Sequence, residues 1–305
     1  MAAPVVVLAG GTGGAKLARG MLDVAGEDLV VVANTGDDVE IHGSYVSPDP
    51  DLVIWWLADR IDERGWGLAG DTFEVMDGLR ELGEEVWFHL GDRDLAACLR
   101  RRARLDEGAT LSQALDELRR SLSVPARVVP MSDEPVRTRV RHAGRWWGLQ
   151  EYLIQAGGAA PVDGVELEGV QAARPAPDAL AAIAEARAIV IGPSNPVVSI
   201  GPILAVPGMR EAIVQSAAPV VAVSPLVGGE VLKGPTAAFL EWAGRPLDAS
   251  GIAATYDGVV DGLVADDRTD AIPTLLTDVL MDGEDGRRRL AQETLRFAQA
   301  LAGPR

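Results

Sequence analysis

Short aliphatic runs alternate with amphipathic stretches along most of the chain. The first run, 5–8, is followed by a glycine-rich segment, an amphipathic stretch at 15–24 and a second aliphatic run at 29–33. This spacing is typical of a βαβ unit with parallel strands. The same criteria predict further strands at 86–90, 127–130, 188–191, 219–223 and 259–264, and helices at 52–60, 72–82, 95–104, 111–122, 178–187, 207–216, 236–243 and 287–301.

One segment departs from this rhythm. Residues 136–141 alternate between apolar and polar or charged side chains, as a half-exposed strand does, and Trp146, Trp147 and Tyr152 follow closely. We therefore expect an α/β fold. Residues 1–129 and 177–305 would form a Rossmann-like, doubly wound and mostly parallel sheet, and residues 130–176 a smaller β-rich insert. Ligands of such sheets bind beyond the carboxyl ends of the strands, where the polar and glycine-rich segments of this chain fall.

Composition narrows the classes of function. The 305 residues include 28 Lys and Arg against 45 Asp and Glu, a formal net charge of −17. This balance argues against a nucleic-acid-binding protein, which works by neutralising phosphates. An anionic ligand would need positive character from helix N-termini, a few basic side chains or a metal. The single cysteine, Cys98, excludes an intramolecular disulfide and a thiolate zinc site.

Neither a secretory leader nor a membrane span is expected. The first residues lack the basic start of a secretory signal and lead directly into the first aliphatic run. The longest charge-free stretch, 188–209, contains four prolines, which do not fit one spanning helix. These features predict a cytoplasmic protein.

The segment after the first strand is a candidate phosphate site. It reads Gly10-Gly11-Thr12-Gly13-Gly14-Ala15-Lys16. The Walker pattern needs glycine before the lysine and Ser or Thr after it, and the dinucleotide pattern needs Gly or Ala in place of the lysine, so neither is matched. Glycines still allow close approach to the backbone, and a helix N-terminus offers N–H groups to an anion. A plain tight turn is the alternative.

Two polar loops follow the second strand and are rich in carboxylates. They read Asn34-Thr35-Gly36-Asp37-Asp38 and Ser47-Pro48-Asp49-Pro50-Asp51. Oxygen-rich clusters suit Mg²⁺, which commonly takes one or two protein carboxylates together with waters and substrate phosphate. Ordinary helix capping by Asp49 or Asp51 is the alternative.

Three later loops also offer ligand-binding groups. Arg93 could bind a phosphate or a planar carbonyl, or pair with Asp94 at a helix start. Ser194 and Asn195 could bind a nucleotide or phosphate, or serve a purely structural loop. Lys233 lies in a glycine-rich segment, as does Lys16, and these are the chain's two lysines. A compact charge on a flexible stem suits phosphate contact.

Together these motifs resemble one family, collinearly from residue 5 to about residue 265. The matching segments are Gly10–Gly13, Asn34–Asp38, Ser47–Asp51, Leu90–Asp94, Pro130–Asp133, Gln150–Glu151, Gly192–Pro196 and Ser224–Leu226. The family is that of the 2-phospho-L-lactate transferases (CofD or FbiA) of coenzyme F420 biosynthesis. Proline at position 50, where the usual pattern has leucine, is one departure.

The resemblance implies an activity. The enzyme would transfer a phosphoenolpyruvyl or 2-phospho-L-lactyl group from its guanosine diphosphate ester to the terminal ribityl hydroxyl of the deazaflavin Fo. GMP would leave, and (dehydro) coenzyme F420-0 would form. The resemblance also implies a Mg²⁺ cofactor and a homodimer. The sequence does not distinguish the lactyl from the enolpyruvyl donor.

The resemblance also implies roles by position. Asp37 and Asp51 would serve catalysis and hold the metal. Asp51, His89 and Arg93 would bind Fo. The phosphates and nucleotide would contact Gly10, Gly11, Thr12, Gly13, Gly14, Lys16, Asn34, Ser194 and Asn195. The general base stays open, because binding a metal lowers the pKa of a carboxylate and makes it a poor base.

Two other functions are considered. One is a nucleotide-sugar-binding regulator of the related gluconeogenesis-factor family, without transferase activity. The segments at 90–94 and 130–133 favour the transferase over it. The other is a NAD-dependent oxidoreductase, which the failed dinucleotide pattern disfavours.

Overall fold

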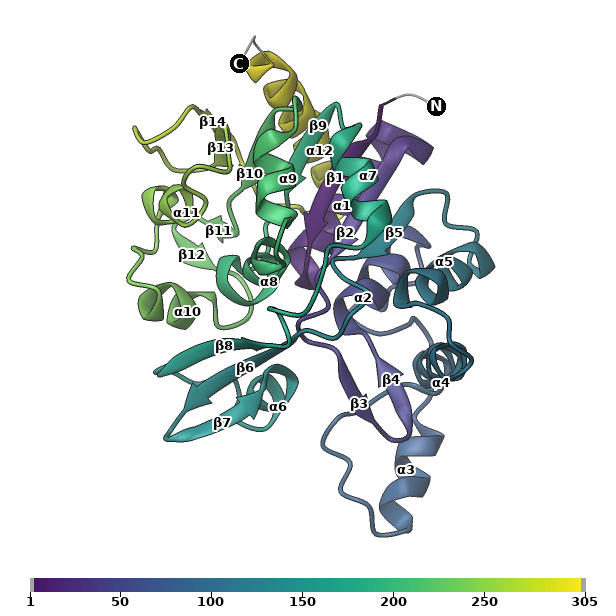
Figure 1. Cartoon of the computed structure of the whole chain (residues 1–305). Coiled ribbons are helices and arrows are strands. Elements are labelled where there is room, and N and C mark those ends of the chain that lie inside the picture. The colour runs from purple at the N-terminus through teal and green to yellow at the C-terminus, as the bar shows by residue number, and fades with distance from the viewer. Residues whose placement is uncertain (1–2, 303–305) are drawn as a thin grey trace.

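The computed structural model describes residues 3–302 and centres on a parallel sheet of seven strands (Figure 1). The strand order is β14-β13-β10-β9-β1-β2-β5, and every neighbouring pair is parallel. These strands are β1 (Val5–Ala9), β2 (Leu29–Ala33), β5 (Arg127–Pro130), β9 (Ala188–Ile191), β10 (Val220–Val223), β13 (Gly262–Ala265) and β14 (Thr274–Leu276). The order reverses between β1 and β9, which is the usual ligand position in a doubly wound sheet.

Helices cover both faces of the sheet (Figure 1). They are α1 (Gly11–Ala25), α2 (Pro48–Leu57), α3 (Glu74–Glu81), α4 (Asp92–Asp106), α5 (Leu111–Ser121), α6 (Leu149–Ile154), α7 (Pro177–Ala184), α8 (Gly201–Ala205), α9 (Met209–Gln215), α10 (Thr236–Trp242), α11 (Ala249–Thr255) and α12 (Gly283–Leu301). Alternate residues of β1 enter the two layers. Val5 and Val7 pack with α1, α2 and α12, whereas Val6 and Leu8 pack with α7, α9 and α11. Burial on both faces explains the unbroken aliphatic runs of the central strands.

Residues 130–176 contain a separate three-stranded antiparallel sheet. Its strands are β6 (Arg137–His142), flanked by β7 (Arg145–Gly148) and β8 (Gly164–Glu168). Val140 and Tyr152 pack with Phe239 of α10 in a small core of their own. Short hairpins complete the fold: β3 (Val39–Ile41) with β4 (Ser44–Val46), and β11 (Leu226–Val227) with β12 (Glu230–Val231). The fold class predicted from the sequence is confirmed.

The strand predicted at 86–90 is wrong. These residues form no strand; Phe88 and Leu90 pack with Met76 and Cys98 in a small core beside β4. The run is apolar because this satellite core buries part of it, and not because it joins a sheet. The edge strand β14 was not predicted, and its short, partly exposed sequence explains the omission.

No single helix among residues 3–302 is long and apolar enough to cross a membrane. One pair, Pro196–Ala205 with Met209–Gln215, meets the criteria of length and composition together but is bent by 85°.

The glycine-rich segment is the first turn of α1, not a loop before it. The helix begins at Gly11 and not at residue 15. Gly11 has φ +63°, which only glycine adopts without strain. At Gly13 a Cβ would collide with the backbone carbonyl oxygen of Pro193. Close packing of the loop after β9 against α1 therefore requires glycine here, independently of any ligand.

We expect Gly13→Ala to lower the free energy of unfolding by about 1–3 kcal/mol, the usual cost of overpacking a site that cannot relax. Gly78→Ala is the matched control. Gly78 is also helical, but its added Cβ would meet open space. Relief of glycine's conformational entropy should make that variant more stable, by up to about 1 kcal/mol. Urea unfolding of both variants measures the difference. Equal stabilities would show that the carbonyl of Pro193 moves aside freely.

Candidate functional site

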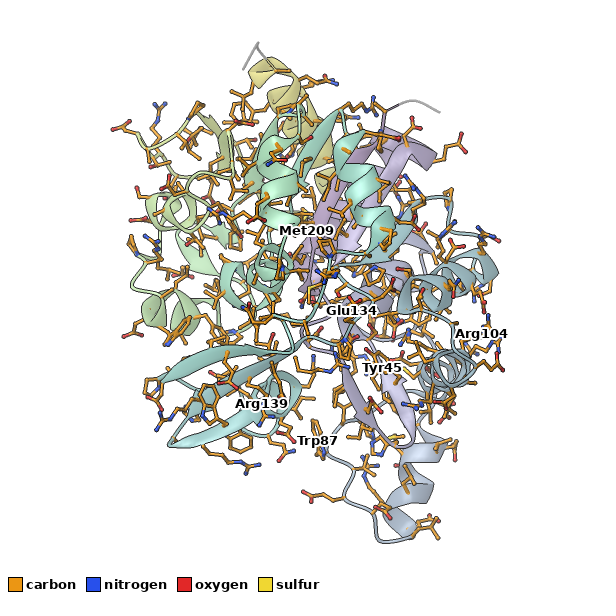
Figure 2. The ribbon with its side chains drawn as sticks, viewed as in Figure 1. Tyr45, Trp87, Arg104, Glu134, Arg139 and Met209 are labelled. Carbon is orange, nitrogen blue, oxygen red and sulfur yellow. The ribbon has the colours of Figure 1, made fainter. Side chains whose placement is uncertain are left out.

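A cavity of about 750 Å³ opens at the carboxyl ends of β1, β2, β9 and β10. The start of α1 forms one wall, and α6 of the insert forms another. Aromatic side chains, including Trp55, Trp66, Trp87 and Phe88, contribute a third. Figure 2 shows Trp87 between the insert and the β3–β4 hairpin. The cavity thus lies where ligands of doubly wound sheets bind.

Side chains from distant loops hold the start of α1. The N–H of Gly10 donates to Ser194 Oγ at 3.2 Å, and the N–H of Gly11 donates to Asp49 Oδ1 at 2.6 Å. One orphan donor of the helix is therefore used inside the protein. Thr12 and Gly13, also in the first turn, line the cavity. They are the positions where this helix terminus can meet an anion.

Asp37 and Asp49 form a buried pair of carboxylates that share one amide. Asn34 Nδ2 donates to Asp49 Oδ2 at 2.8 Å and to Asp37 Oδ1 at 3.5 Å. Gln150 Nε2, from the insert, donates to Asp37 Oδ2 at 2.9 Å. Both carboxylates line the cavity. Their neighbours thus fix the orientation of the pair without neutralising it.

The pKa values of both carboxyl groups are raised, because the pair is buried without a cation beside it among the described residues. Burial raises the pKa of Asp37 well above its usual range, and the charges of Asp49 and Asp38 raise it further. Burial also raises the pKa of Asp49 to about 6, against the opposing hydrogen bonds from Asn34 and Gly11. A pair of buried oxygen ligands that resists ionisation fits a divalent cation, which would stabilise both charged forms.

Asp38 is engaged away from the cavity. It accepts hydrogen bonds from Tyr45 Oη at 2.9 Å and Ser47 Oγ at 2.7 Å. Burial raises its pKa to about 7, although the charge of Arg137 acts in the opposite direction. Tyr45 lies on β4 (Figure 2) and also accepts from Arg137 Nη2 at 3.0 Å. This network fixes the acidic loop against the insert.

Asp51 lies in a different cluster from Asp37. It forms a buried ion pair with Arg101 of α4, which also donates to the carbonyl oxygen of Tyr45 at 2.9 Å. Ligand atoms of Asp51, Asp94 and Cys98 lie within 4.8 Å of one another. Burial raises the pKa of Asp51, while Arg101 lowers it. Burial and then the charge of Asp51 raise the pKa of Asp94 to about 7.

The remaining predicted residues divide into two groups. His89 lines the cavity and stacks on Phe73, with ring centroids 4.6 Å apart. Lys16, Ser194 and Asn195 also line it. Arg93 is exposed in the first turn of α4 and is not among the described residues that line the cavity. Its backbone N–H donates to Asp71. Asn34 and Gly14 are buried behind the cavity wall.

The sequence alone gave no specific role to several residues that shape the site. Asp49 was predicted only as one carboxylate of the possible Mg²⁺ cluster or as a helix cap, whereas in the structure it also contacts α1 and Asn34. Gln150 appeared only inside a motif. Arg101 gave no local signal, because its partner Asp51 is fifty positions away. The density of carboxylates in the loop at 47–51 was the only sequence feature that indicated a need for a buried basic partner.

The ion pair of Asp51 with Arg101 generates a stability prediction. We expect Arg101→Met to lower the free energy of unfolding by about 3–5 kcal/mol, because it leaves a buried carboxylate unpaired. Arg102→Met, on the next residue of α4, removes only exposed pairs with Asp106 and Glu40 and should cost about 1 kcal/mol or less. Adding Asp51→Asn to Arg101→Met should restore part of the loss. Equal effects at both arginines, measured by urea unfolding, would contradict the assignment.

Comparison with known proteins gives consistent results. The sequence model of the family described as 2-phospho-L-lactate transferase CofD matches residues 5–288. A phosphoenolpyruvate transferase from Kitasatospora aureofaciens is 39% identical, over 94% of this chain and 97% of its own. A 2-phospho-L-lactate transferase from Methanopyrus kandleri is 38% identical, over 98% of this chain and 99% of its own.

Solved structures extend the likeness in fold. A UPF0052-family protein from Bacillus halodurans has a TM-score of 0.63 at 18% identity, covering 97% of this chain and 99% of its own. That similarity concerns the fold alone. The family assignment rests on the sequence relatives, which are named as transferases. They do not favour the alternative prediction of a regulator without transferase activity. The chain belongs to the 2-phospho-L-lactate transferase CofD family.

Proposed function

We propose that this protein is the transferase predicted from its sequence. It would move a phosphoenolpyruvyl or 2-phospho-L-lactyl group from a guanosine diphosphate ester to the ribityl hydroxyl of Fo, releasing GMP. The observation that carries the proposal is the cavity itself. It brings the N-terminus of α1 and the buried Asp37–Asp49 pair to one place in a chain that matches named transferases over nearly its whole length.

The residues present fit a magnesium ion. Asp37 and Asp49 offer hard oxygen ligands that form no ion pair with a basic side chain among residues 3–302, and Asn34 and Gln150 hold them in place. When bound, Mg²⁺ would supply charge neutralisation for a diphosphate. Asp51 was predicted to share this role. Its ion pair with Arg101 supports a second position, toward the Fo end of the cavity, and makes Asp49 the stronger candidate beside Asp37.

The protein's own groups would bind and orient the two substrates. Thr12 and Gly13 would present backbone N–H groups to the phosphates, and Ser194 would keep the preceding turn in place. His89, stacked on Phe73, and the neighbouring Trp87 and Phe88 would form a wall for the planar deazaflavin. Such a transfer needs positioning and charge stabilisation more than a covalent nucleophile. A homodimer and a cytoplasmic location stay predictions of the family resemblance.

The decisive experiment incubates the protein with Fo, Mg²⁺ and each guanosine diphosphate ester in turn, followed by mass analysis. We expect GMP and one F420-0 species. Chelation should abolish transfer and Mg²⁺ should restore it. Asp37→Asn should lower kcat by about 100-fold, the scale for loss of a main electrostatic stabiliser. Full turnover after chelation would exclude the metal. Failure to quench Fo fluorescence, with no product from either ester, would favour the regulator.

The raised pKa values generate a separate test without turnover. These carboxylates titrate near pH 4 in an unfolded chain, so the folded protein binds extra protons above that pH. In the metal-free protein, the contribution of these carboxyl groups to the free energy of unfolding should therefore be largest below about pH 4. It should lose that contribution as the pH rises through 6 and 7, where Asp49 and Asp38 ionise.

Magnesium should reverse this loss for the cavity-facing pair. We expect Mg²⁺ to raise Tm more at pH 8 than at pH 5, because protons compete with it at the lower pH. Asp37→Asn should remove most of the Mg²⁺-dependent rise in Tm. Asp278→Asn, on an exposed carboxylate outside the cavity, is the control and should keep it. A rise in Tm that is independent of pH would contradict binding at these carboxylates.

A further inference from the structure

Three cations gather beside the glycine-rich start of α1. Lys16 and Lys233, the chain's two lysines, line both the main cavity and an adjoining hollow of about 430 Å³. Arg287, from the first half of α12, lines that hollow as well. We call these three residues the cation cluster. Its members come from three distant parts of the sequence, so folding alone brings them together.

Trp56 is the surface on which two of the cations rest. Lys16 Nζ lies 5.8 Å, and Arg287 Cζ 5.1 Å, from the centroid of its indole ring. Trp56 is 8% exposed and is fixed in the core that α1, α2 and α12 form. Cation–π attraction holds both charges at a rigid base. The geometry is therefore built into the helix packing, although Lys233 itself lies on an exposed loop.

The cluster is not balanced by the protein's own carboxylates. Asp59 and Asp62, which line the same hollow, pair with Arg19 and Arg64. Among residues 3–302, no ion pair includes Lys16, Lys233 or Arg287. Glu63 also lines the hollow without neutralising the cluster by an ion pair. Burial lowers the pKa of Lys16, the charges of Arg287 and Lys233 lower it further, and Asp282 opposes them only in part.

Such a grouping is costly unless an anion completes it. Like charges held close repel one another, and this chain has 45 acidic residues available to pair with its 28 basic ones. Most other arginines of the helices are paired; Arg288, next to Arg287, is one example. Three unpaired cations facing a shared hollow are typical of a site for an external anion.

The chemistry of the donor identifies the anion, and this step rests on the proposed function. The acids in the names of the relatives, phosphoenolpyruvate and 2-phospho-L-lactate, each carry a carboxylate beside the phosphate ester. The start of α1 and the Asp37–Asp49 site would meet the diphosphate, which leaves the carboxylate without a partner. We propose that Lys16, Lys233 and Arg287 bind the carboxylate of the donor's three-carbon acid.

This assignment has a consequence for specificity. Both acids have the same carboxylate, so the cluster would select for an acid without distinguishing enolpyruvate from lactate. Lys16, which lines both cavities, would stand between the phosphate and the carboxylate. Arg287 lies only in the adjoining hollow and would contact the carboxylate alone. Arg287 is therefore the residue that separates the two parts of the donor.

The test compares two ligands in calorimetric titrations with Mg²⁺: GDP, which lacks the carboxylate, and the phosphoenolpyruvyl ester of guanosine diphosphate. We expect Arg287→Gln to weaken binding of the ester about tenfold or more and binding of GDP less than twofold. Arg287→Lys should keep much of the affinity for the ester. Arg288→Gln, on the adjacent residue with its surface ion pair to Asp285, should change neither affinity.

Further outcomes separate this inference from the proposed function. An equal loss for GDP and ester in Arg287→Gln would make the cluster a phosphate site and overturn the assignment, as would no change for either ligand. Lys233→Gln, on an exposed loop, is the second variant if Arg287→Gln fails to fold. Because Lys233 lines both cavities, the expected result there is a larger loss of affinity for the ester than for GDP, and an equal loss overturns the assignment. A wild-type protein that binds the ester but transfers nothing to Fo contradicts the proposed function alone. A wild-type protein that does not bind the ester contradicts the carboxylate site as well.

Discussion

The carboxylate of Asp49 is the contact on which the site depends. One oxygen accepts from the N–H of Gly11 at the start of α1, and the other accepts from the amide of Asn34 at the end of β2. A single side chain therefore joins α1, β2 and its own helix α2 at the edge of the sheet. Ser194, from the loop after β9, adds the fourth segment through Gly10. The four segments meet where the strand order reverses, and the cavity forms between them.

This arrangement concentrates negative charge where an anionic substrate would bind. The fold deals with this negative charge in three ways. Arg101 neutralises Asp51 inside the protein, at the cost of burying both charges. Hydrogen bonds from Tyr45 and Ser47 hold Asp38. Within the part of the chain that the structure describes, Asp37 and Asp49 accept hydrogen bonds from amide and backbone N–H groups and form no ion pair, and both carboxylates line the cavity. The cation cluster faces the adjoining hollow, and its two lysines also line the main cavity.

The sequence predicted the central sheet well because most of its strands are short aliphatic runs that can be recognised locally. The runs at 127–130 and 188–191 became β5 and β9 at the predicted bounds. In the central strand β9, burial on both faces demands unbroken apolar residues. The run at 86–90 has the same local character but packs into a satellite core, which no local rule distinguishes. The glycines at 10–14 were identified as important, but part of the reason is packing: Gly13 is required by the carbonyl of Pro193. Tertiary contacts of this kind have no signature in the residues that make them.

The same distinction explains which charges were found and which were missed. Asp37 and Asp51 stand in motifs, whereas Arg101 and Arg287 stand in helices that look like ordinary exposed helices. Their function depends on partners 50 and 231 positions away, Asp51 and Trp56. The fold alone cannot supply this information either, because a protein at 18% identity shares it. What distinguishes this chain is where the cation cluster and the Asp37–Asp49 pair lie relative to the start of α1. Both groups lie beside this helix terminus: Asp49 accepts from Gly11, and Lys16 and Arg287 rest on Trp56. An elongated ligand that carries a diphosphate and a second anion would match both groups at once.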